Sequence, residues 1–377
     1  MEDKNLLILN GEVFLDGEFV KKDIRIEDGK FAEITEQGLL LDKNNMQLLD
    51  AEGKYIIPGL VDVHTHGRIG LDFSKITEEG LEKLLESYRI CGVTSVLATI
   101  MTNAPEIVEE SLRVLGKYIG KQENAAYGSR ASLLGIHMEG PFLGTEKKGA
   151  HDEKYLCKPD WNRFEKWQQI SGGTIRLVTV DPCLSGAEEF ITNCMANGVK
   201  VSLGHTACNY DTAVKAGQWG ADHITHTFNA MNLLHHREPG LIGAAMDTGM
   251  YTELICDGIH VHPAMVRMLF AAHPDKTVLV SDSIPVEGMP DGEYTSGGLN
   301  VVSKAGKAVL ADGTIAGSAV SLFDCMVNTI KFGVPAEYAI NSATYLAAKS
   351  IGMENVAGSI AKGRRADFLV VNKPCQR

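Results

Sequence analysis

Apolar and polar residues alternate along both ends of the chain, whereas its middle carries short runs that are almost wholly apolar. Near the N-terminus this period-two alternation is interrupted by Asp16-Gly17 and Asp28-Gly29, which is typical of short strands joined by tight hairpin turns. The stretch 366–372 near the C-terminus shows the same kind of strand-like pattern. We therefore expect residues 1–57 and 352–377 to form one small antiparallel, β-sandwich-like domain from both chain ends.

Residues 58–351 instead alternate short buried strands with helical stretches, a pattern typical of α/β folds. Eight strands with mostly helical crossovers favour a closed (β/α)8 TIM-type barrel over an open sheet, so we expect this range to be one barrel domain. The predicted strands are 59–66, 95–100, 133–139, 175–180, 201–205, 223–227, 253–256 and 278–282, and the predicted helices include 78–88, 105–118, 187–197 and 263–272.

Three further elements are expected after the eighth strand. Apolar periodicity predicts helices near 321–331 and 336–351. The segment 300–318, with an Asp312-Gly313 turn, predicts a hairpin inserted in the last loop of the barrel.

The ends of the predicted strands carry side chains that bind metals. Active sites of barrels lie at the carboxyl ends of the strands. Two histidines of the first strand share a face because strand side chains repeat every two residues, although such a pair alone could equally cap a loop. Burying a whole ring of unpaired acids and imidazoles would be costly, so together they indicate a metal site. The set comprises His64, His66, Glu139, His205, His226 and Asp282.

Imidazole and carboxylate ligands suit divalent transition metals. The strand-one pair with Glu139 could hold one ion, and Glu139 with His205 and His226 could hold another, the carboxylate bridging when both are present. We expect one or two ions per subunit; zinc is favoured, with iron, cobalt and manganese as alternatives. Such an ion would generate a hydroxide nucleophile near neutral pH, and Asp282 is then the candidate general base and acid, or a further ligand.

Composition excludes some classes of partner. The net charge of −12 argues against nucleic acid, whose phosphates are bound by basic surfaces, and no apolar run is long enough to cross a bilayer. The acidic residues near Met1 do not resemble a secretory signal. Eight scattered cysteines without a Cys-x-x-Cys pair favour reduced thiols and a cytoplasmic location. An anionic substrate would need a locally positive pocket.

Longer motifs carry a resemblance along essentially the whole chain, at 58–66, 137–143, 148–151, 204–206, 225–231, 257–260, 281–283, 310–318 and 342–344. In these motifs the chain resembles the amidohydrolase superfamily, and most closely its N-acetylglucosamine-6-phosphate deacetylase family. The His-x-His pair and Asp282 are shared across the superfamily. Gly-Pro-Phe after Glu139, Phe-Asn-Ala-Met at 228–231 and Ala-Gly-Ser at 316–318 narrow the resemblance to the deacetylases.

The resemblance implies hydrolysis of the acetamide of an amino-sugar 6-phosphate, in amino-sugar catabolism or cell-wall recycling. Asp282 would take the proton of the attacking water and pass it to the leaving amine, while His260 would polarise the acetyl oxygen. The phosphate would meet Asn229, the backbone N–H of Ala230, His151 and Arg237. In the family this arginine reaches into the neighbouring subunit's site, which implies a homodimer.

Several alternatives stay open at this stage. The loop 144–149 beside His151 could be a mobile lid, or His151 could be an ordinary exposed residue. Arg237 could likewise be an ordinary surface residue. The substrate could instead be N-acetylgalactosamine 6-phosphate, an epimer that differs in the configuration at one hydroxyl group. No motif in the sequence distinguishes the two sugars. Another superfamily hydrolase, such as a dihydroorotase or a dipeptidase, would usually carry a bridging lysine where Glu139 stands. A metal-binding protein without activity could lose Asp282 or the histidines, yet all are present.

Overall fold

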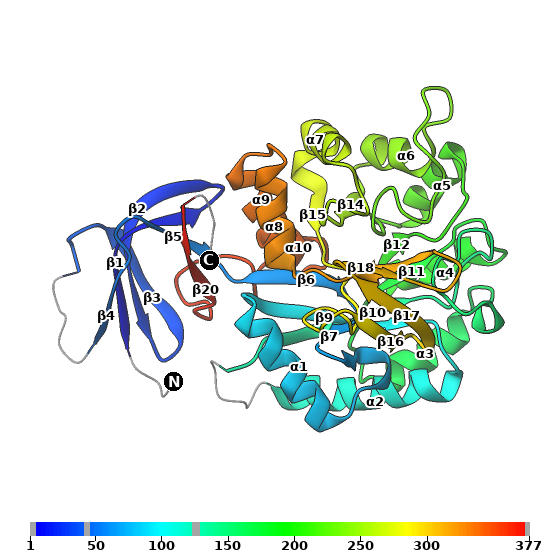
Figure 1. Cartoon of the computed structure of the whole chain (residues 1–377), viewed down its shortest axis with the longest axis horizontal. Helices are drawn as coiled ribbons and strands as arrows, with labels where there is room; N and C mark the ends of the chain where they lie inside the picture. Colours follow the sequence, from blue (N-terminus) through cyan, green and yellow to red (C-terminus); the bar gives the residue numbers. More distant parts are fainter. Residues whose placement is uncertain (1–4, 41–45, 123–128, 374–377) are drawn as a thin grey trace.

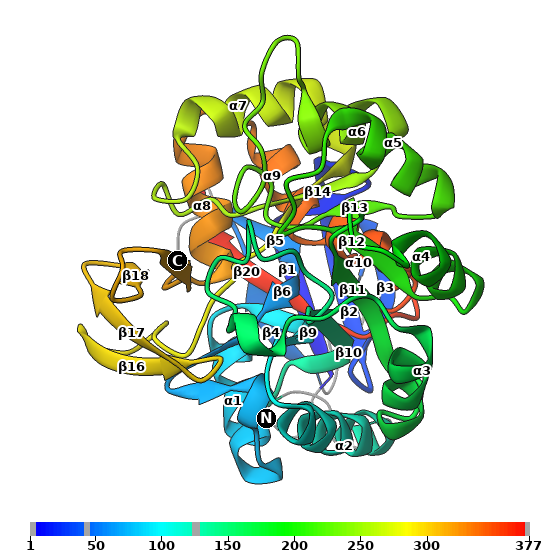
Figure 2. The same cartoon turned by 90° about the vertical axis from the view of Figure 1, so that its right-hand side faces the viewer.

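A parallel sheet of eight strands forms the centre of the computed structural model, which describes residues 5–40, 46–122 and 129–373. The strand order is β15-β14-β13-β12-β11-β10-β9-β6, so neighbours in the sheet are neighbours along the chain. Figure 2 shows the helices arranged around these strands, and the predicted (β/α)8 barrel is confirmed. The strands are β6 (Leu60–Thr65), β9 (Val93–Met101), β10 (Ser132–Glu139), β11 (Ile175–Val180), β12 (Lys200–Leu203), β13 (His223–Ile224), β14 (Tyr251–Leu254) and β15 (Thr277–Leu279).

The helices pack their apolar faces on the outside of the barrel. In α1, Leu81, Leu84, Leu85 and Tyr88 are buried at helical spacing, and the Thr77 side chain caps the first turn by accepting from the Gly80 N–H. In the described part of the chain, no helix is long and apolar enough to cross a membrane. The barrel helices are α1 (Glu78–Ile90), α2 (Pro105–Gln122), α3 (Trp161–Ile170), α4 (Ala187–Ala196), α5 (Tyr210–Trp219), α6 (Gly240–Thr248), α7 (Pro263–Ala272) and α8 (Leu322–Lys331).

The helix predicted over 336–351 is two helices, α9 (Ala336–Ala343) and α10 (Tyr345–Ser350). The break lies at Thr344, whose backbone leaves the helical region with φ −132° and ψ −93°. Its hydroxyl group donates to the Ile340 carbonyl at 2.7 Å, a bond that competes with the regular helix pattern.

The two edge strands of the barrel sheet, β6 and β15, meet just beyond the end of β15. The Asp282 N–H donates to the His64 carbonyl at 2.9 Å, and the His66 N–H donates to the Ser283 carbonyl at 2.8 Å. The Ser281 N–H also donates to the Asp62 side chain at 3.3 Å. The barrel is therefore closed at the carboxyl edge of its strands, where barrel active sites lie.

A second sheet combines both ends of the chain and lies beside the end of the barrel at which β6 begins (Figure 1). Its first three strands are joined by the two expected Asp-Gly turns, in which Asp16 and Asp28 have φ of 49°. The purely antiparallel pairing that we expected is wrong, because β4 and β5 both run parallel to β1. The chain crosses over after β3 and places β4 and β5 beside β1 without a tight hairpin to it. They can therefore run in the same direction as β1. The strands are β1 (Leu6–Leu15), β2 (Glu18–Glu27), β3 (Lys30–Glu36), β4 (Gln47–Asp50), β5 (Lys54–Pro58) and β20 (Phe368–Asn372).

The division into domains at 1–57 with 352–377, and at 58–351, stays a prediction. Residues 1–4, 41–45 and 374–377 of the first of these lie outside the described residues.

The insertion after the eighth strand is larger than the predicted hairpin at 300–318. It is an antiparallel sheet of four strands within the described residues, β16 (Gly292–Ser296), β17 (Leu299–Lys304), β18 (Lys307–Val309) and β19 (Ile315–Ser318). We call it the inserted sheet. The Ser318 N–H donates to the Asp282 carbonyl at 2.8 Å, so the sheet is anchored at the candidate site. The remaining short elements are β7 (Gly67–Arg68), β8 (Leu71–Asp72) and the 3-10 turns η1 (Phe73–Lys75), η2 (Glu153–Tyr155) and η3 (Pro274–Lys276).

Candidate metal centre and substrate cavity

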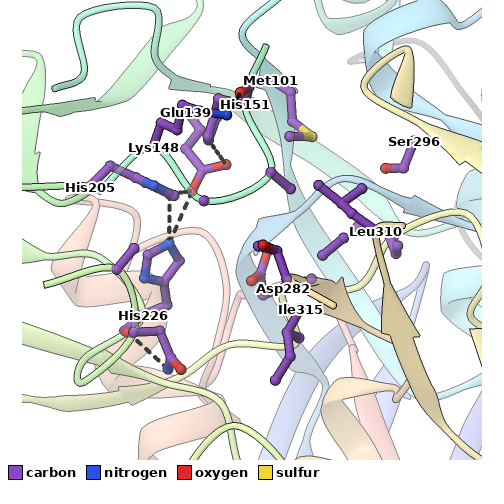
Figure 3. Close-up of a pocket in the computed structure, with 18 of the residues that line it drawn as sticks. Met101, Glu139, Lys148, His151, His205, His226, Asp282, Ser296, Leu310 and Ile315 are labelled. Atoms are coloured by element: carbon purple, nitrogen blue, oxygen red, sulfur yellow. Dashed lines mark hydrogen bonds and ion pairs between the residues drawn. The ribbon is translucent and has the colours of Figure 1, made fainter. Parts of the chain in front are cut away.

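Glu139, the last residue of β10, lies at the centre of the candidate site. Its Oε1 atom is 3.2 Å from His205 Nε2, 3.3 Å from His226 Nε2 and 3.4 Å from His64 Nε2. The Nε2 atoms of His205 and His226 lie only 3.0 Å apart, so both rings point at the same place (Figure 3). Three strands of the barrel thus direct imidazole nitrogens at one carboxylate oxygen.

The second oxygen of Glu139 faces two more imidazoles. Its Oε2 atom is 3.2 Å from His66 Nε2 and 3.5 Å from His151 Nε2. Asp282 Oδ1 lies 3.2 Å from His66 Nε2 and 3.4 Å from His64 Nε2. All of these side chains belong to residues that are at most 7% exposed. The structure therefore brings together every residue of the predicted rim, namely His64, His66, Glu139, His205, His226 and Asp282.

Three of these residues sit just beyond the strands rather than on them. β12 ends at Leu203 and β13 at Ile224, so His205 and His226 follow them by two residues, and Asp282 follows the end of β15 at Leu279 by three. Their φ angles are 48°, 28° and 47°, in the left-handed region that non-glycine residues rarely occupy. Such conformations persist where the surrounding structure holds them, and they are typical of functional sites.

The donor set fits a divalent cation. His64 Nε2, which faces Glu139 and Asp282, is buried and has no hydrogen-bond partner within the described structure. An unpartnered buried nitrogen is costly unless a ligand satisfies it. Two groups have ligand atoms within 4.8 Å of one another: His64 with His66 and Glu139, and Glu139 with His151 and His205. A cation between them would meet imidazole and carboxylate ligands, a set typical of zinc and similar metals.

Electrostatics prepare the two carboxyl groups and His205 for that task. Burial would raise the pKa of Asp282, but His64 and His66 outweigh it and lower this pKa to about 2. Burial likewise opposes ionisation of Glu139, yet the surrounding imidazoles hold its pKa well below the usual value. Burial, reinforced by His151, lowers the pKa of His205 to about 4. At neutral pH both carboxyl groups are therefore charged and His205 keeps a free lone pair, the forms that coordinate a cation.

A cavity of about 540 Å³ opens above this cluster. One wall is the loop from Thr145 to His151, and the opposite wall comes from the inserted sheet, with Val301, Leu310 and Ile315. Figure 3 shows Glu139, His151, His205 and His226 on one side, facing Asp282 and the apolar Leu310 and Ile315. The cavity has the size of a small-molecule site and combines a charged floor with an apolar wall.

Comparison with known proteins agrees with this geometry. Residues 55–376 match the Amidohydrolase family. N-acetylglucosamine-6-phosphate deacetylase of Bacillus subtilis is 32% identical over 377 residues, which cover 99% of this chain and 94% of that protein. The crystal structure of N-acetylglucosamine-6-phosphate deacetylase from Pasteurella multocida has a TM-score of 0.91 at 26% identity and covers 99% of this chain and 96% of that one. The chain belongs to the amidohydrolase family and, within it, to the N-acetylglucosamine-6-phosphate deacetylase family.

A further solved member of the deacetylase family carries a ligand. It is an aspartate-to-alanine mutant of N-acetyl-D-glucosamine-6-phosphate deacetylase from Mycobacterium smegmatis, in complex with N-acetyl-D-glucosamine-6-phosphate. Its TM-score is 0.91 at 28% identity, and the match covers 99% of this chain and 96% of that one.

In this member of the deacetylase family, His151 and His260 line the cavity, and each has a hydrogen-bond partner that fixes its ring. His151 is only 2% exposed, so the alternative of an ordinary exposed residue is wrong. Its Nδ1 lies 2.9 Å from Thr102 Oγ1, which leaves Nε2 toward Glu139. His260 Nδ1 lies 2.6 Å from Asp257 Oδ2, and Asp257 Oδ1 accepts the His260 N–H at 2.8 Å. Each ring is thus held through one nitrogen and offers the other.

The three other predicted phosphate contacts lie on one segment after β13. Asn229 and Ala230 line the cavity and are partly exposed. Arg237 lies on an exposed loop, where its Nη1 contacts His236 Nε2 at 2.8 Å, and it is absent from the lining formed by the described residues. The structure therefore does not bring Arg237 into the cavity of its own chain.

Sequence reasoning gave no role to two carboxylates that hold site histidines. Asp257 binds His260, and Glu253 Oε2 lies 2.8 Å from His64 Nδ1. Asp257 begins the 257–260 motif that also holds His260, whereas Glu253 is marked in the sequence only as an acidic residue inside an apolar run. Four of the remaining histidines have structural partners: His137 contacts Thr99 and Thr179, His223 contacts Asp222, His262 caps α7 and His273 contacts the Met250 carbonyl.

Proposed function

We propose that this protein hydrolyses N-acetyl-D-glucosamine 6-phosphate to D-glucosamine 6-phosphate and acetate, in the cytoplasm and as a step of amino-sugar catabolism. The observation that carries the proposal is the cluster of buried imidazoles around Glu139, beside Asp282 and below a small-molecule cavity. Full-length relatives that bear this activity in their names support the substrate.

We assign the metal to the Glu139 cluster, with zinc favoured and iron, cobalt or manganese as alternatives. His205 and His226 would hold one ion with Glu139, and His64 and His66 would hold a second. A divalent cation at this place lowers the pKa of a bound water and polarises a carbonyl group.

Asp282 is the proton carrier of the proposed reaction. With a pKa of about 2 it is ionised at neutral pH, so it can accept a proton from the attacking water. Its Oδ1 lies against His64 and His66, so it faces the cluster. The protonated acid would then give the proton to the departing amine.

His260 would stabilise the acetyl oxygen as negative charge develops on it. Asp257 accepts a hydrogen bond from His260 Nδ1–H, which fixes the ring and leaves Nε2 as the atom that would face the acetyl oxygen. Donors aimed at a developing oxyanion act most strongly in a site that excludes water, and the His260 side chain is only 7% exposed.

The phosphate group would be bound by Asn229, the Ala230 N–H and His151, with Arg237 supplied by a second copy of the chain. The support is that Arg237 lies on an exposed loop and does not line the cavity of its own chain. The same loop carries Leu233, which is 84% exposed, a large apolar side chain that contact with a partner would cover. The protein would therefore act as a homodimer.

Purified, zinc-loaded protein should release acetate from N-acetylglucosamine 6-phosphate and act far more slowly on N-acetylglucosamine. Equal rates on the two sugars would show that no phosphate site exists. Parallel assays with N-acetylgalactosamine 6-phosphate decide the epimer preference, and faster turnover of that sugar would replace the proposed substrate.

A further inference from the structure

Glu253 is a fully buried carboxyl group below the candidate metal cluster. It lies on β14, the seventh barrel strand, and is 0% exposed. Its Oε2 atom accepts a hydrogen bond from His64 Nδ1 at 2.8 Å, across 189 positions of the chain. Its other oxygen, Oε1, has no partner within the described structure. A half-satisfied buried carboxyl group weakens packing rather than improving it, so its presence points to a task at the site.

The contact with Glu253 decides how His64 can act. Because Nδ1 donates its proton to Glu253, the lone pair of the neutral ring must lie on Nε2. That Nε2 is buried, has no hydrogen-bond partner, and faces Glu139 Oε1 and Asp282 Oδ1, each at 3.4 Å. The ring plane is held as well, since His137 packs edge-on against His64 with 4.6 Å between ring centroids.

Glu253 also supports the backbone of a second candidate ligand. Its Oε2 lies 3.3 Å from the His226 N–H, and its own carbonyl accepts the Thr227 N–H at 2.7 Å. These two bonds enclose His226, whose φ of 28° is unfavourable for a non-glycine residue. One residue of the seventh strand thus braces a ligand from each of the two proposed metal positions.

We propose that Glu253 is a positioning residue that fixes the tautomer and direction of His64, so that binding of a cation by His64, His66 and Glu139 depends on it. Second-layer carboxylates act in this way on metal-bound histidines, and their loss typically weakens binding ten- to a hundredfold. The inference rests on the proposed function in so far as that function places a metal at this cluster.

The test counts ions rather than products. Apo-protein is dialysed against zinc held at defined free concentrations by a chelator, and bound zinc per chain is measured by mass spectrometry. Wild type should bind two ions, and His64→Ala should bind one. Glu253→Leu, which fills the space without an acceptor, should bind the ion of the His64 position about ten- to a hundredfold more weakly. Glu253→Gln keeps an acceptor oxygen and should remain close to wild type.

A matched control is available in the same barrel. Asp222 Oδ1 lies 2.7 Å from His223 Nδ1, a contact of the same kind at the start of β13 rather than at the cluster. Asp222→Leu, which likewise removes the acceptor, should therefore lower stability without changing the zinc count. A general loss of stability would affect both variants, whereas the proposed role changes zinc binding only in Glu253→Leu.

A second measurement keeps the proposal open to disproof if Glu253→Leu does not fold. Nitrogen NMR of zinc-loaded, histidine-labelled protein, with His64→Ala for assignment, should find His64 protonated on Nδ1 and not on Nε2. A proton on Nε2, unweakened zinc binding in Glu253→Leu, or a wild-type count that His64→Ala leaves unchanged would each overturn the proposal. Acetate release is assayed separately, so failure of the proposed substrate would not be mistaken for failure of the zinc result.

Discussion

Glu139 and Asp282 are both buried carboxylates of the site, yet their surroundings separate their roles. Glu139 contacts imidazoles through both oxygens, which is the arrangement of a bridging ligand. Asp282 contacts two imidazoles through Oδ1 alone, and it also lines the cavity. Glu139 is therefore suited to hold ions and Asp282 to exchange protons with a bound substrate.

Asp282→Asn should lower kcat by a factor on the order of 100 to 10,000, because the amide cannot take the proton. KM and zinc content should change little, since the side chain keeps its size and Glu139 keeps its contacts. Steady-state kinetics with zinc analysis on the same preparation checks this expectation. Near-normal turnover in the variant would exclude Asp282 as the proton carrier.

The rim residues were predictable as a set, because each lies at or just beyond the carboxyl end of a strand and these ends must face the same side of the barrel. Glu253 was not predictable, because its proposed role depends on its contact with His64. That contact joins two different strands, and sequence spacing gives no sign of it. His151 was predicted to line the site but not to contact Glu139, since nothing in the loop sequence fixes how deeply it folds inward.

Among the elements, the inserted sheet controls the position of Asp282 through one glycine. Gly317 has φ of 61°, and a Cβ atom there would lie 2.5 Å from Ile284 Cγ2 and 2.9 Å from the Asp282 carbonyl oxygen. Its neighbour Ser318 donates to that same carbonyl. Glycine is thus required in the Ala-Gly-Ser segment for close approach to the backbone of Asp282, the proposed proton carrier.

Gly317→Ala should displace Asp282 and lower kcat about ten- to a hundredfold, since small misplacements of reacting groups have effects of this size. Gly306→Ala is the matched control, because Gly306 also has a left-handed φ (76°) but has nothing within 4 Å of an added Cβ. Both variants should lose about 1 kcal/mol of stability from backbone strain. Thermal melts and kinetics together separate the two effects, and equal kcat values would argue against the contact.

Element boundaries were least predictable where the backbone leaves regular structure. The strands that carry His205, His226 and Asp282 end earlier than their apolar runs suggested, because these residues adopt left-handed backbone. Thr344 divides a helix whose apolar spacing is continuous. Hydrophobic periodicity reports which face is buried, and it does not report such local departures.

At the scale of the molecule, the proposed dimer predicts that two inactive variants restore activity when they assemble together. Arg237→Ala and Asp282→Asn should each be nearly inactive at low substrate concentration. If Arg237 acts on the partner's cavity, a mixed dimer of the two variants contains one intact site. Co-expressed, randomly assorted variants should then recover about a quarter of wild-type activity in a symmetric dimer.

The readout of that experiment is kcat/KM of the mixed population, with each variant expressed alone as the control. Absence of any recovery would place Arg237 in its own chain's site or outside catalysis. Sedimentation of wild type gives the oligomeric state independently, and a monomer would remove the basis for the experiment.

The closure of the barrel at its carboxyl edge has a consequence for synthesis. The hydrogen bonds that join β6 to the segment after β15 run through His64, His66 and Asp282 themselves, and Asp62 and Ser281 at the same seam are 219 positions apart. A ribosome must therefore deliver almost the whole barrel before the first two histidines meet their aspartate. A growing chain or a fragment that ends before β15 cannot hold a complete site. Catalysis can therefore begin only after the barrel has folded.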